Sequence, residues 1–455
     1  MIASRRFPIL RPRGLAALCA GLLVLPLALS GTARAIPGRT VHATRGGTVR
    51  AIPGRTAHAT PGGTVRATAA GTPRPVGGAA ATIAAKPWLM AQYRREAPVV
   101  APVRVTATAA LLMDARTGEV LYSRNPHLVW PPASTTKVLT ALVALESMPL
   151  DSMITISPEV AKFRVGSVVG LPQGAKISLH DLLYGLMLQS GNDVALAVAE
   201  GVAGSVPAFV ARMNAEAKRL GARQTHFTSP HGLYDPNHYT TAYDLALITR
   251  VAMQNPTFED IVRTREWRFQ PPIGPAHVLW NHNRLLSRYA GADGVKTGYV
   301  DMSGETLVAS ATRNGWRLIA VLLHSGDMWG DAQRLLSYGF DHYRSIELAR
   351  AGEEMAAIQV RGGDGLLLGV VPAPVYGVVS GETEPVRRVV VDRHLTLPIR
   401  RGARVGEVDF YEEGRLLQSA PLVAARSLSA RTDLEDVLHW MGVVVQHVVG
   451  AAAVL

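Results

Sequence analysis

The sequence predicts an α+β protein, in which an antiparallel sheet flanked by helices and carrying a helical subdomain is followed by a small all-β domain and a C-terminal amphipathic helix. Three observations support this fold class. Helical periodicity dominates 134–253, strand-like alternation follows over 294–324, and short Val-rich segments with Gly and Pro turns fill the chain after 345. A chain of 455 residues with 48% hydrophobic residues can form two or three structural units.

Composition divides the chain into five segments. We expect a signal peptide over 1–35, a disordered Gly/Pro/Arg-rich linker over 36–104, a large mixed unit over 105–345, a small β-rich domain over 346–428 and an amphipathic membrane-anchor helix over 429–455.

The first segment has the composition of a secretory signal peptide. Arginines precede an apolar stretch over 15–29, and a small-x-small cleavage sequence follows over 33–35. The single cysteine, Cys19, lies within the apolar stretch, so the mature chain would lack cysteine. We therefore expect an exported protein without thiolate catalysis or thiolate metal sites.

The linker is repetitive and basic. Residues 35–50 recur as 51–66 with 14 of 16 positions identical, and the segment holds too few apolar residues to form a core. Because the whole chain carries +12 and residues 1–104 carry +14, residues 105–455 carry about −2. This distribution argues against nucleic-acid binding by the folded part. The basic tail could contact an anionic membrane or wall polymer, or be a solvated export tail.

Within 105–345, hydrophobic periodicity predicts the elements in order. We expect strands over 106–113, 120–122, 294–300, 305–312 and 316–324, and helices over 134–146, on both sides of 190–192, and over 207–220, 241–253 and 331–343. The dipeptide Asn314-Gly315 predicts a tight hairpin turn between the last two strands, so the sheet is expected to be antiparallel.

After 345 we expect strands over 357–360, 386–391 and 404–411. The final segment becomes almost wholly apolar after Trp440, with roughly 16 apolar-rich residues where about 20 span a bilayer. This pattern favours a helix that lies in the membrane surface, with Trp440 at the interface. A helix packed on the β domain is the alternative.

Ser134 and Lys137 form the first candidate pair of functional residues. They stand three residues apart at the start of an apolar-periodic run, so a helix there would place both side chains on one face of its first turn. A serine becomes a nucleophile with a base in hydrogen-bond reach, and a lysine can be that base when burial or a nearby cation lowers its pKa. An N-cap serine beside a solvated lysine is the alternative interpretation.

Two further motifs lie downstream in settings that could converge on the first. Ser190-Gly191-Asn192 interrupts a helical pattern, and Lys296-Thr297-Gly298 falls in a predicted edge strand. With the stretches PPASTTK, SGND, SPHGLYDPNHYTTAYDLALI and GVKTGY, the chain resembles the penicillin-recognising serine enzymes. Among these it is most similar to the low-molecular-mass penicillin-binding proteins that are serine-type D-alanyl-D-alanine carboxypeptidases.

The resemblance implies a catalytic domain over 105–345 with the penicillin-binding transpeptidase fold, and an acyl-enzyme mechanism. Ser134 would attack the carbonyl of the penultimate D-alanine, and Lys137, near the second cation Lys296, would take the Ser134 proton. Ser190 would relay a proton to the leaving D-alanine, and Asn192 would position Lys137 and the amide of the acyl chain.

The same resemblance implies that the strand binds the substrate. Lys296 and Thr297 would bind its terminal carboxylate, and Gly298 would let the peptide lie against the strand. The backbone N–H groups of Ser134 and Tyr299 would form the oxyanion hole. The implied partners are the peptidoglycan pentapeptide and β-lactam inhibitors, at the outer face of the cytoplasmic membrane or in the cell wall.

Two departures from the family pattern concern the substrate carboxylate and turnover. An arginine often stands before the closing helix of such enzymes, whereas this chain has Met328 in the stretch 326–331, with Arg334 farther along. Tyr299 follows Lys-Thr-Gly where a histidine is common.

No cofactor is expected. A metal site built from His226, His231, Asp235 and His238 is disfavoured because these residues lack a helical His-x-x-x-His spacing. Two other functions are disfavoured. A β-lactamase would need an added deacylating glutamate, which the motifs do not provide, and a non-catalytic wall-binding protein would not need Ser134 and Lys137 together.

Overall fold

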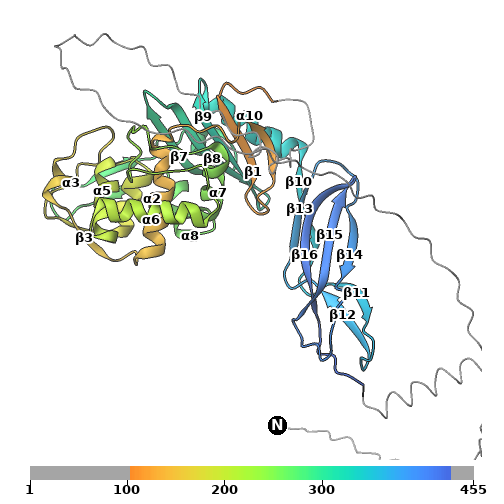
Figure 1. The fold of residues 1–455 in the computed structure, drawn as a ribbon. Helices are drawn as coiled ribbons and strands as arrows, with labels where there is room; N and C mark the ends of the chain where they lie inside the picture. The colour runs from red at the N-terminus through yellow and green to blue at the C-terminus, as the bar shows by residue number, and fades with distance from the viewer. Residues whose placement is uncertain (1–102, 432–455) are drawn as a thin grey trace, which may run out of the picture. The chain divides into compact units, whose positions relative to one another are not determined.

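The computed structural model describes residues 103–431. The expected signal peptide, the linker up to residue 102 and the C-terminal segment from 432 lie outside the described residues. Within the described range, the α+β fold class and the following all-β domain are confirmed (Figure 1).

The larger part of the fold is built on one antiparallel five-stranded sheet of order β2-β1-β9-β8-β7. Its strands are β1 Ala109–Asp114, β2 Val120–Arg124, β7 Ala292–Val300, β8 Gly304–Arg313 and β9 Trp316–Ser325. Asn314 and Gly315 both have positive φ, 51° and 76°, as the predicted two-residue turn requires. Strand β1 lies between β2 and β9, β9 is the central strand, and β7 forms an edge.

Each face of this sheet packs against helices. Along β9 the buried residues alternate, so that Ile319, Val321 and Leu323 join one core while Leu318 and Leu322 join the other. The first core contains the helical subdomain, and the second contains helix α10, Met328–His342. This two-sided burial explains why the central strands read as nearly continuous apolar runs.

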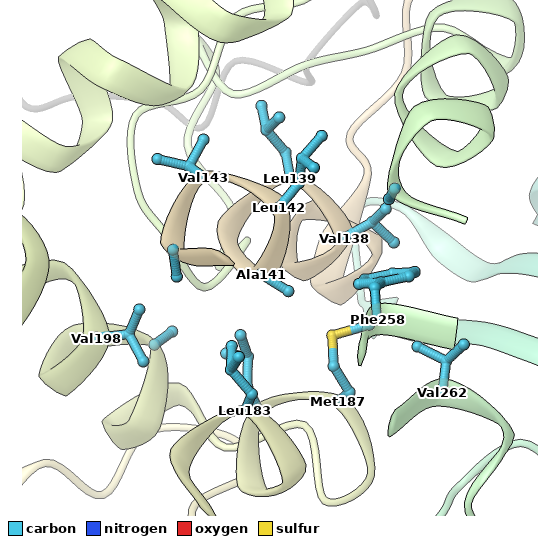
Figure 2. Packing of buried hydrophobic residues seen from close by; sticks show 14 of the residues in the cluster. Val138, Leu139, Ala141, Leu142, Val143, Leu183, Met187, Val198, Phe258 and Val262 are labelled. Carbon is cyan, nitrogen blue, oxygen red and sulfur yellow. The ribbon is translucent and has the colours of Figure 1, made fainter. Parts of the chain in front are cut away.

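Helix α2, Lys137–Ser147, is the centre of the helical subdomain. Figure 2 shows Leu183, Met187, Val198, Phe258 and Val262 gathered around its apolar side chains. The surrounding elements are η1 Ala133–Thr136, α3 Pro158–Lys162, α4 Leu179–Met187, α5 Asn192–Ala203, α6 Val206–Arg219, α7 Ala242–Ala252, α8 Pro256–Arg263 and α9 Leu285–Arg288. Burial of α2 on all sides holds its first turn in one place.

Two expected helix starts are corrected. The helix expected from 134 opens as a 3₁₀ turn, and α-helical geometry begins only at Lys137. The closing helix begins at Met328 rather than 331, because the side chain of Asp327 accepts a hydrogen bond from Gly330 N–H at 3.0 Å.

Two small hairpins were not predicted. They are β3 Met153–Thr155 with β4 Lys176–Ser178, and β5 Glu266–Phe269 with β6 His277–Trp280. Strands of three or four residues are too short to show a clear alternation.

The second part is all β. A pair, β10 Arg344–Ala349 with β13 Val375–Val379, accompanies a sheet of order β11-β12-β16-β15-β14. The sheet strands are β11 Glu354–Gln359, β12 Leu366–Val370, β14 Val386–Val391, β15 Arg404–Glu412 and β16 Arg415–Ala424. The strand expected at 357–360 therefore begins three residues earlier.

Among residues 103–431, no single helix has the length and hydrophobicity of a membrane span; one pair, α5 and α6, passes that test jointly but is bent by 86°.

Candidate active site

The turn that carries Ser134 has an unusual backbone. Ala133, directly before it, has φ 50°, which is rare for a residue with a side chain. The carbonyl of Ala133 accepts a hydrogen bond from the Thr136 hydroxyl at 2.7 Å. Gly232 approaches this carbonyl so closely that a Cβ there would lie 1.9 Å from the oxygen. The left-handed conformation of Ala133 is thus restrained by the Thr136 hydroxyl and by the close approach of Gly232.

Lys137 is fully buried, with 0% of its surface exposed. Its Nζ lies 2.9 Å from Ser134 Oγ, 2.7 Å from Asn192 Oδ1 and 2.7 Å from the backbone oxygen of His231. The amide and backbone oxygens can only accept hydrogen bonds. A neutral amine has two N–H groups and one lone pair, so donation to these two oxygens directs the lone pair to the Ser134 hydroxyl.

Electrostatics favours that neutral amine. Burial lowers the pKa of Lys137 well below its ordinary value, and the positive charge of Lys296 lowers it further, against the opposing effect of Asp193. Lys296 is itself 1% exposed, and burial lowers its pKa to about 7. Two buried lysines therefore share one region, and the lowered pKa of Lys137 favours the neutral amine, which is the form that can act as a base.

The Ser190–Asn192 loop is fastened to the chain around it. Asn192 donates through Nδ2 to the Val165 carbonyl at 2.9 Å, which leaves Oδ1 to accept from Lys137. Ser190 is 4% exposed and has φ 61°. Its hydroxyl makes no hydrogen bond within residues 103–431.

Asp193 was part of the SGND stretch but received no role from the sequence. It is fully buried, and its carboxylate accepts hydrogen bonds from the N–H groups of Val169, Gly170 and Leu171 at 3.0, 2.7 and 3.2 Å. These bonds tie residues 169–171 to the start of α5. Asp193 thus orders the chain beside the site and adds a negative charge near Lys137.

Strand β7 lies directly against the Ser134 turn. A Cβ on Gly298 would lie 2.8 Å from Ser134 N and 2.5 Å from the hydroxyl oxygen of Thr306. Thr306 in turn donates to the Pro132 carbonyl at 3.0 Å, which fastens β8 to the same turn. The sequence interpretation assigned Gly298 to an approaching peptide; the structure adds that glycine is required for β7 to reach the turn.

The remaining strand residues differ in exposure. Lys296 Nζ donates to the Thr297 carbonyl at 3.2 Å, and the Thr297 side chain is half-buried. Tyr299 is 63% exposed, and its hydroxyl donates to Asp301 Oδ1 at 3.1 Å. That hydrogen bond and the charge of Asp301 raise the pKa of the phenol. Tyr299 is therefore a surface residue of β7, whereas Lys296 of the same strand is buried.

A further contact, between His238 and Thr136, was not predicted from the sequence. His238 is buried, and its Nε2 lies 2.8 Å from the hydroxyl oxygen of Thr136. Its Nδ1 accepts from the N–H of Thr228 at 3.0 Å. The sequence marked His238 only as part of the stretch 229–248 and of the disfavoured metal cluster, because nothing in its local pattern links it to position 136.

His226, His231 and Arg334, which the sequence analysis also considered, each have contacts of their own. Among residues 103–431, no group of three or more His, Cys, Asp or Glu side chains is arranged to hold a metal ion. The His231 ring stacks on Phe163 with centroids 5.9 Å apart, and His226 Nδ1 lies 2.7 Å from the Asn237 carbonyl oxygen. Arg334 pairs with Asp327 at 3.1 Å and also with Asp331, as expected for a surface residue of α10.

The arrangement combines a serine hydroxyl, a buried amine aimed at it, a second buried cation and an edge strand. Such a set can transfer an acyl group from a peptide that lies along the strand, because nucleophile, base and a partner for negative charge are all within one region. In such a transfer the lysine would take the role that a histidine has in the Ser-His-Asp hydrolases.

Two family models match the chain. Residues 95–326 match the model described as "D-alanyl-D-alanine carboxypeptidase", and residues 343–430 match "Penicillin-binding protein 5, C-terminal domain". Two curated proteins are similar over most of their length. The D-alanyl-D-alanine carboxypeptidase DacC of Escherichia coli is 32% identical over 355 residues, covering 74% of this chain and 87% of the relative. DacF of Bacillus subtilis is 28% identical over 334 residues, covering 71% and 86%.

A solved structure has the same arrangement of elements. Penicillin binding protein 5 from Haemophilus influenzae superposes with a TM-score of 0.67 at 30% sequence identity, covering 73% of this chain and 100% of that one.

Proposed function

The chain belongs to the D-alanyl-D-alanine carboxypeptidase family, and from this premise we propose how its residues perform the reaction. The protein is a serine-type carboxypeptidase that removes the terminal D-alanine from peptidoglycan stem peptides and is acylated by β-lactams. The observation that carries the mechanism is the position of the buried Lys137 amine, 2.9 Å from Ser134 Oγ and bonded to two acceptor oxygens.

In the acylation step, Ser134 Oγ attacks the carbonyl carbon of the penultimate D-alanine while its proton passes to Lys137 Nζ. The backbone N–H groups of Ser134 and Tyr299 stabilise the negative oxygen that forms. The carbon–nitrogen bond then breaks, and the proton that Lys137 took from Ser134 passes through Ser190 to the leaving D-alanine amine, which returns Lys137 to its neutral form. The support for this step is that Lys137 is buried beside a second cation, which keeps its lone pair available.

In the deacylation step, water attacks the ester on Ser134 with Lys137 again accepting a proton, and Ser134 recovers its hydrogen. Asn192 holds Lys137 and the amide of the acyl chain through both steps. Its Nδ2–H bond to Val165 supports this role, because the bond fixes which end of the amide faces the lysine.

Strand β7 holds the substrate in this proposal. As an edge strand it has one unpaired side, on which an extended peptide can add as another strand. Lys296 supplies positive charge for the terminal carboxylate, and Thr297 supplies a hydroxyl. Met328 stands in the stretch where the family resemblance leads us to expect an arginine, and Arg334 is engaged by Asp327 and Asp331. Lys296 is therefore the principal cation for the carboxylate.

The mechanism is tested by the release of D-alanine from diacetyl-lysyl-D-alanyl-D-alanine. The S134A variant is expected to release none and to lose labelling by a fluorescent penicillin, and K137A is expected to fall by at least about 10³-fold. Labelling of S134A at the wild-type rate would refute the assignment of the nucleophile.

We also propose where the enzyme works. Residues 1–35 direct export, residues 36–104 form a spacer, and an amphipathic helix within 429–455 attaches the chain to the outer face of the cytoplasmic membrane. The apolar composition of 441–455, which contains no Asp, Glu, Lys or Arg, supports this attachment. Loss of membrane association on deletion of 432–455 tests it.

A further inference from the structure

One end of the β domain is rich in arginine. Strand registers bring three segments together there, namely the β11–β12 turn (360–366), the β14–β15 connection (392–404) and the segment after β16 (425–431). Isolated bridges join Ile399 to Leu428 and Gly363 to Ala430. In Figure 1 this is the end of the domain near the turn between β11 and β12.

The three segments define a surface that we call the arginine end. It contains seven arginines and two aspartates, for a charge of +5. The arginines are Arg361, Arg393, Arg400, Arg401, Arg404, Arg426 and Arg431. The opposite end, formed by 380–385 and 412–415, contains four glutamates and one arginine. The domain is therefore strongly polarised along its strands, although its total charge is small.

Several of these arginines are not neutralised. Within the described part of the chain, Arg361, Arg393, Arg400 and Arg401 are exposed and form no ion pair, while Arg404 pairs with Glu407 at 3.1 Å. The backbone under them is ordered by hydrogen bonds, such as that from Arg401 N–H to Ser427 Oγ at 3.1 Å. The positive charges are thus presented to solvent from a fixed frame.

Apolar side chains are interleaved with these charges. Leu366 is 50% exposed, and Leu395 and Leu397 are half-buried in the same segments. Leu395 and Leu397 pack against the core of the domain, so Leu366 is the leucine that these segments present to solvent. Arginines around an exposed leucine suit a membrane interface, where guanidinium groups meet phosphates and the leucine enters the head-group layer. The arginine end is also where the chain continues into 432–455, whose last fifteen residues contain no Asp, Glu, Lys or Arg.

We propose that the arginine end is a membrane contact in its own right, which binds the anionic head groups of phospholipids beside the point where the C-terminal segment begins. The inference goes beyond hydrolysis, and it rests on the proposed membrane attachment only for the choice of a lipid surface over an anionic wall polymer. The arginine end and the C-terminal segment would strengthen each other's binding, because attachment of one holds the other at a high effective concentration near the membrane.

The test uses the full-length exported chain in vesicle flotation. Vesicles contain either phosphatidylcholine alone or equal parts of phosphatidylcholine and phosphatidylglycerol. The R400Q/R401Q variant removes two charges from the arginine end. The R387Q/R388Q variant is the matched control, because it removes two exposed charges from β14 of the same domain. Release of D-alanine in solution checks that both variants are folded.

We expect R400Q/R401Q to bind anionic vesicles at least about tenfold more weakly than wild type, since each arginine near such a surface strengthens binding about fivefold. The control is expected to stay within about threefold, and raised salt should remove the difference. Equal losses in both variants would overturn the proposal, as would wild-type binding that ignores phosphatidylglycerol.

Other outcomes separate this inference from the remaining proposals. If R400Q/R401Q loses binding to isolated anionic wall polymer but not to vesicles, the lipid contact is refuted. If wild type binds no vesicles, both the arginine end and the C-terminal attachment are refuted. Binding only to anionic vesicles supports the arginine end and counts against an apolar anchor. Failure of the wild-type protein to release D-alanine bears on the catalytic mechanism alone.

Discussion

The His238 imidazole lies 2.8 Å from the Thr136 hydroxyl, and this contact joins a buried histidine to the turn that carries Ser134. Because Nδ1 accepts from Thr228 N–H, the proton of the neutral ring is on Nε2. Nε2–H therefore donates to Thr136, which donates to the Ala133 carbonyl at 2.7 Å. This chain of hydrogen bonds supports the left-handed residue next to the nucleophile.

Replacing Thr136 by Val should slow acylation. The variant keeps the shape of the side chain but removes the hydroxyl between His238 and Ala133, so the Ser134 turn loses a restraint. We expect the rate of labelling by a fluorescent penicillin to fall about tenfold, with a loss of about 1–3 kcal/mol in the free energy of unfolding.

The matched control is Thr140→Val. Thr140 is also fully buried and donates to the Pro230 carbonyl at 2.7 Å and to the Thr136 carbonyl at 3.5 Å, but within residues 103–431 it makes no hydrogen bond to Ala133. It should lose comparable stability and keep its acylation rate. Equal slowing in both variants would mean that Thr136 acts only through general stability.

Acid should destabilise the fold through two buried histidines. Burial lowers the pKa of His231 to about 3 and that of His238 to about 4, against 6.5 for an unshifted histidine. Below pH 6.5 these histidines are protonated in the unfolded chain but stay neutral in the folded chain. The free energy of unfolding therefore has its full value above pH 6.5 and decreases as the pH falls towards 4. Urea unfolding across this range measures the slope, which should be shallower in H238Q. An unchanged slope in H238Q would contradict the assigned neutral ring.

Lys296 should control the pH dependence of acylation. Its positive charge lowers the pKa of Lys137, so its removal in K296Q should raise that pKa. We expect the acidic limb of the pH–rate profile for penicillin acylation to move to higher pH. K296R keeps a positive charge at every pH and should not show this movement. If the acidic limbs of the pH–rate profiles of K296Q and K296R coincide, the electrostatic effect of Lys296 on the pKa of Lys137 is refuted.

Gly298→Ala should disable the site without unfolding the protein. The new Cβ would lie 2.8 Å from Ser134 N, so either β7 or the Ser134 turn must move. We expect the rate of D-alanine release to fall at least about 100-fold.

Thr306→Ala is the useful second change. It removes the hydroxyl oxygen that would lie 2.5 Å from the new Cβ, but it leaves the contact with Ser134 N. Compared with G298A, the double variant G298A/T306A should therefore regain more of the lost stability than of the lost rate of D-alanine release. Full recovery of rate would show that Thr306, rather than the Ser134 turn, is the obstacle.

Much of the fold follows from local patterns. The Asn314-Gly315 turn and the apolar runs on either side predicted β8 and β9 to within about two residues, because a two-residue hairpin leaves little freedom of register. The motif spacing likewise predicted a lysine beside Ser134, since three residues span one helical turn. The structure forms this contact on a 3₁₀ turn rather than within an α-helix.

The supporting contacts could not be predicted in this way. His238 meets Thr136 across 102 residues, and the intervening loop has no periodicity from which its path could be derived. The left-handed conformation of Ala133 is imposed by packing against Gly232, whereas alanine alone favours a regular helix. Tertiary packing, not local preference, decides these features.

The backbone at Ala133 and Ser190 has a consequence for protein engineering. A non-glycine residue in the left-handed region costs roughly 1–2 kcal/mol, so glycine at either position would relieve strain. It would also let the chain beside the catalytic groups sample more conformations. A screen that rewards heat resistance alone would therefore favour replacements here that reduce turnover, and a useful selection must score both properties at once.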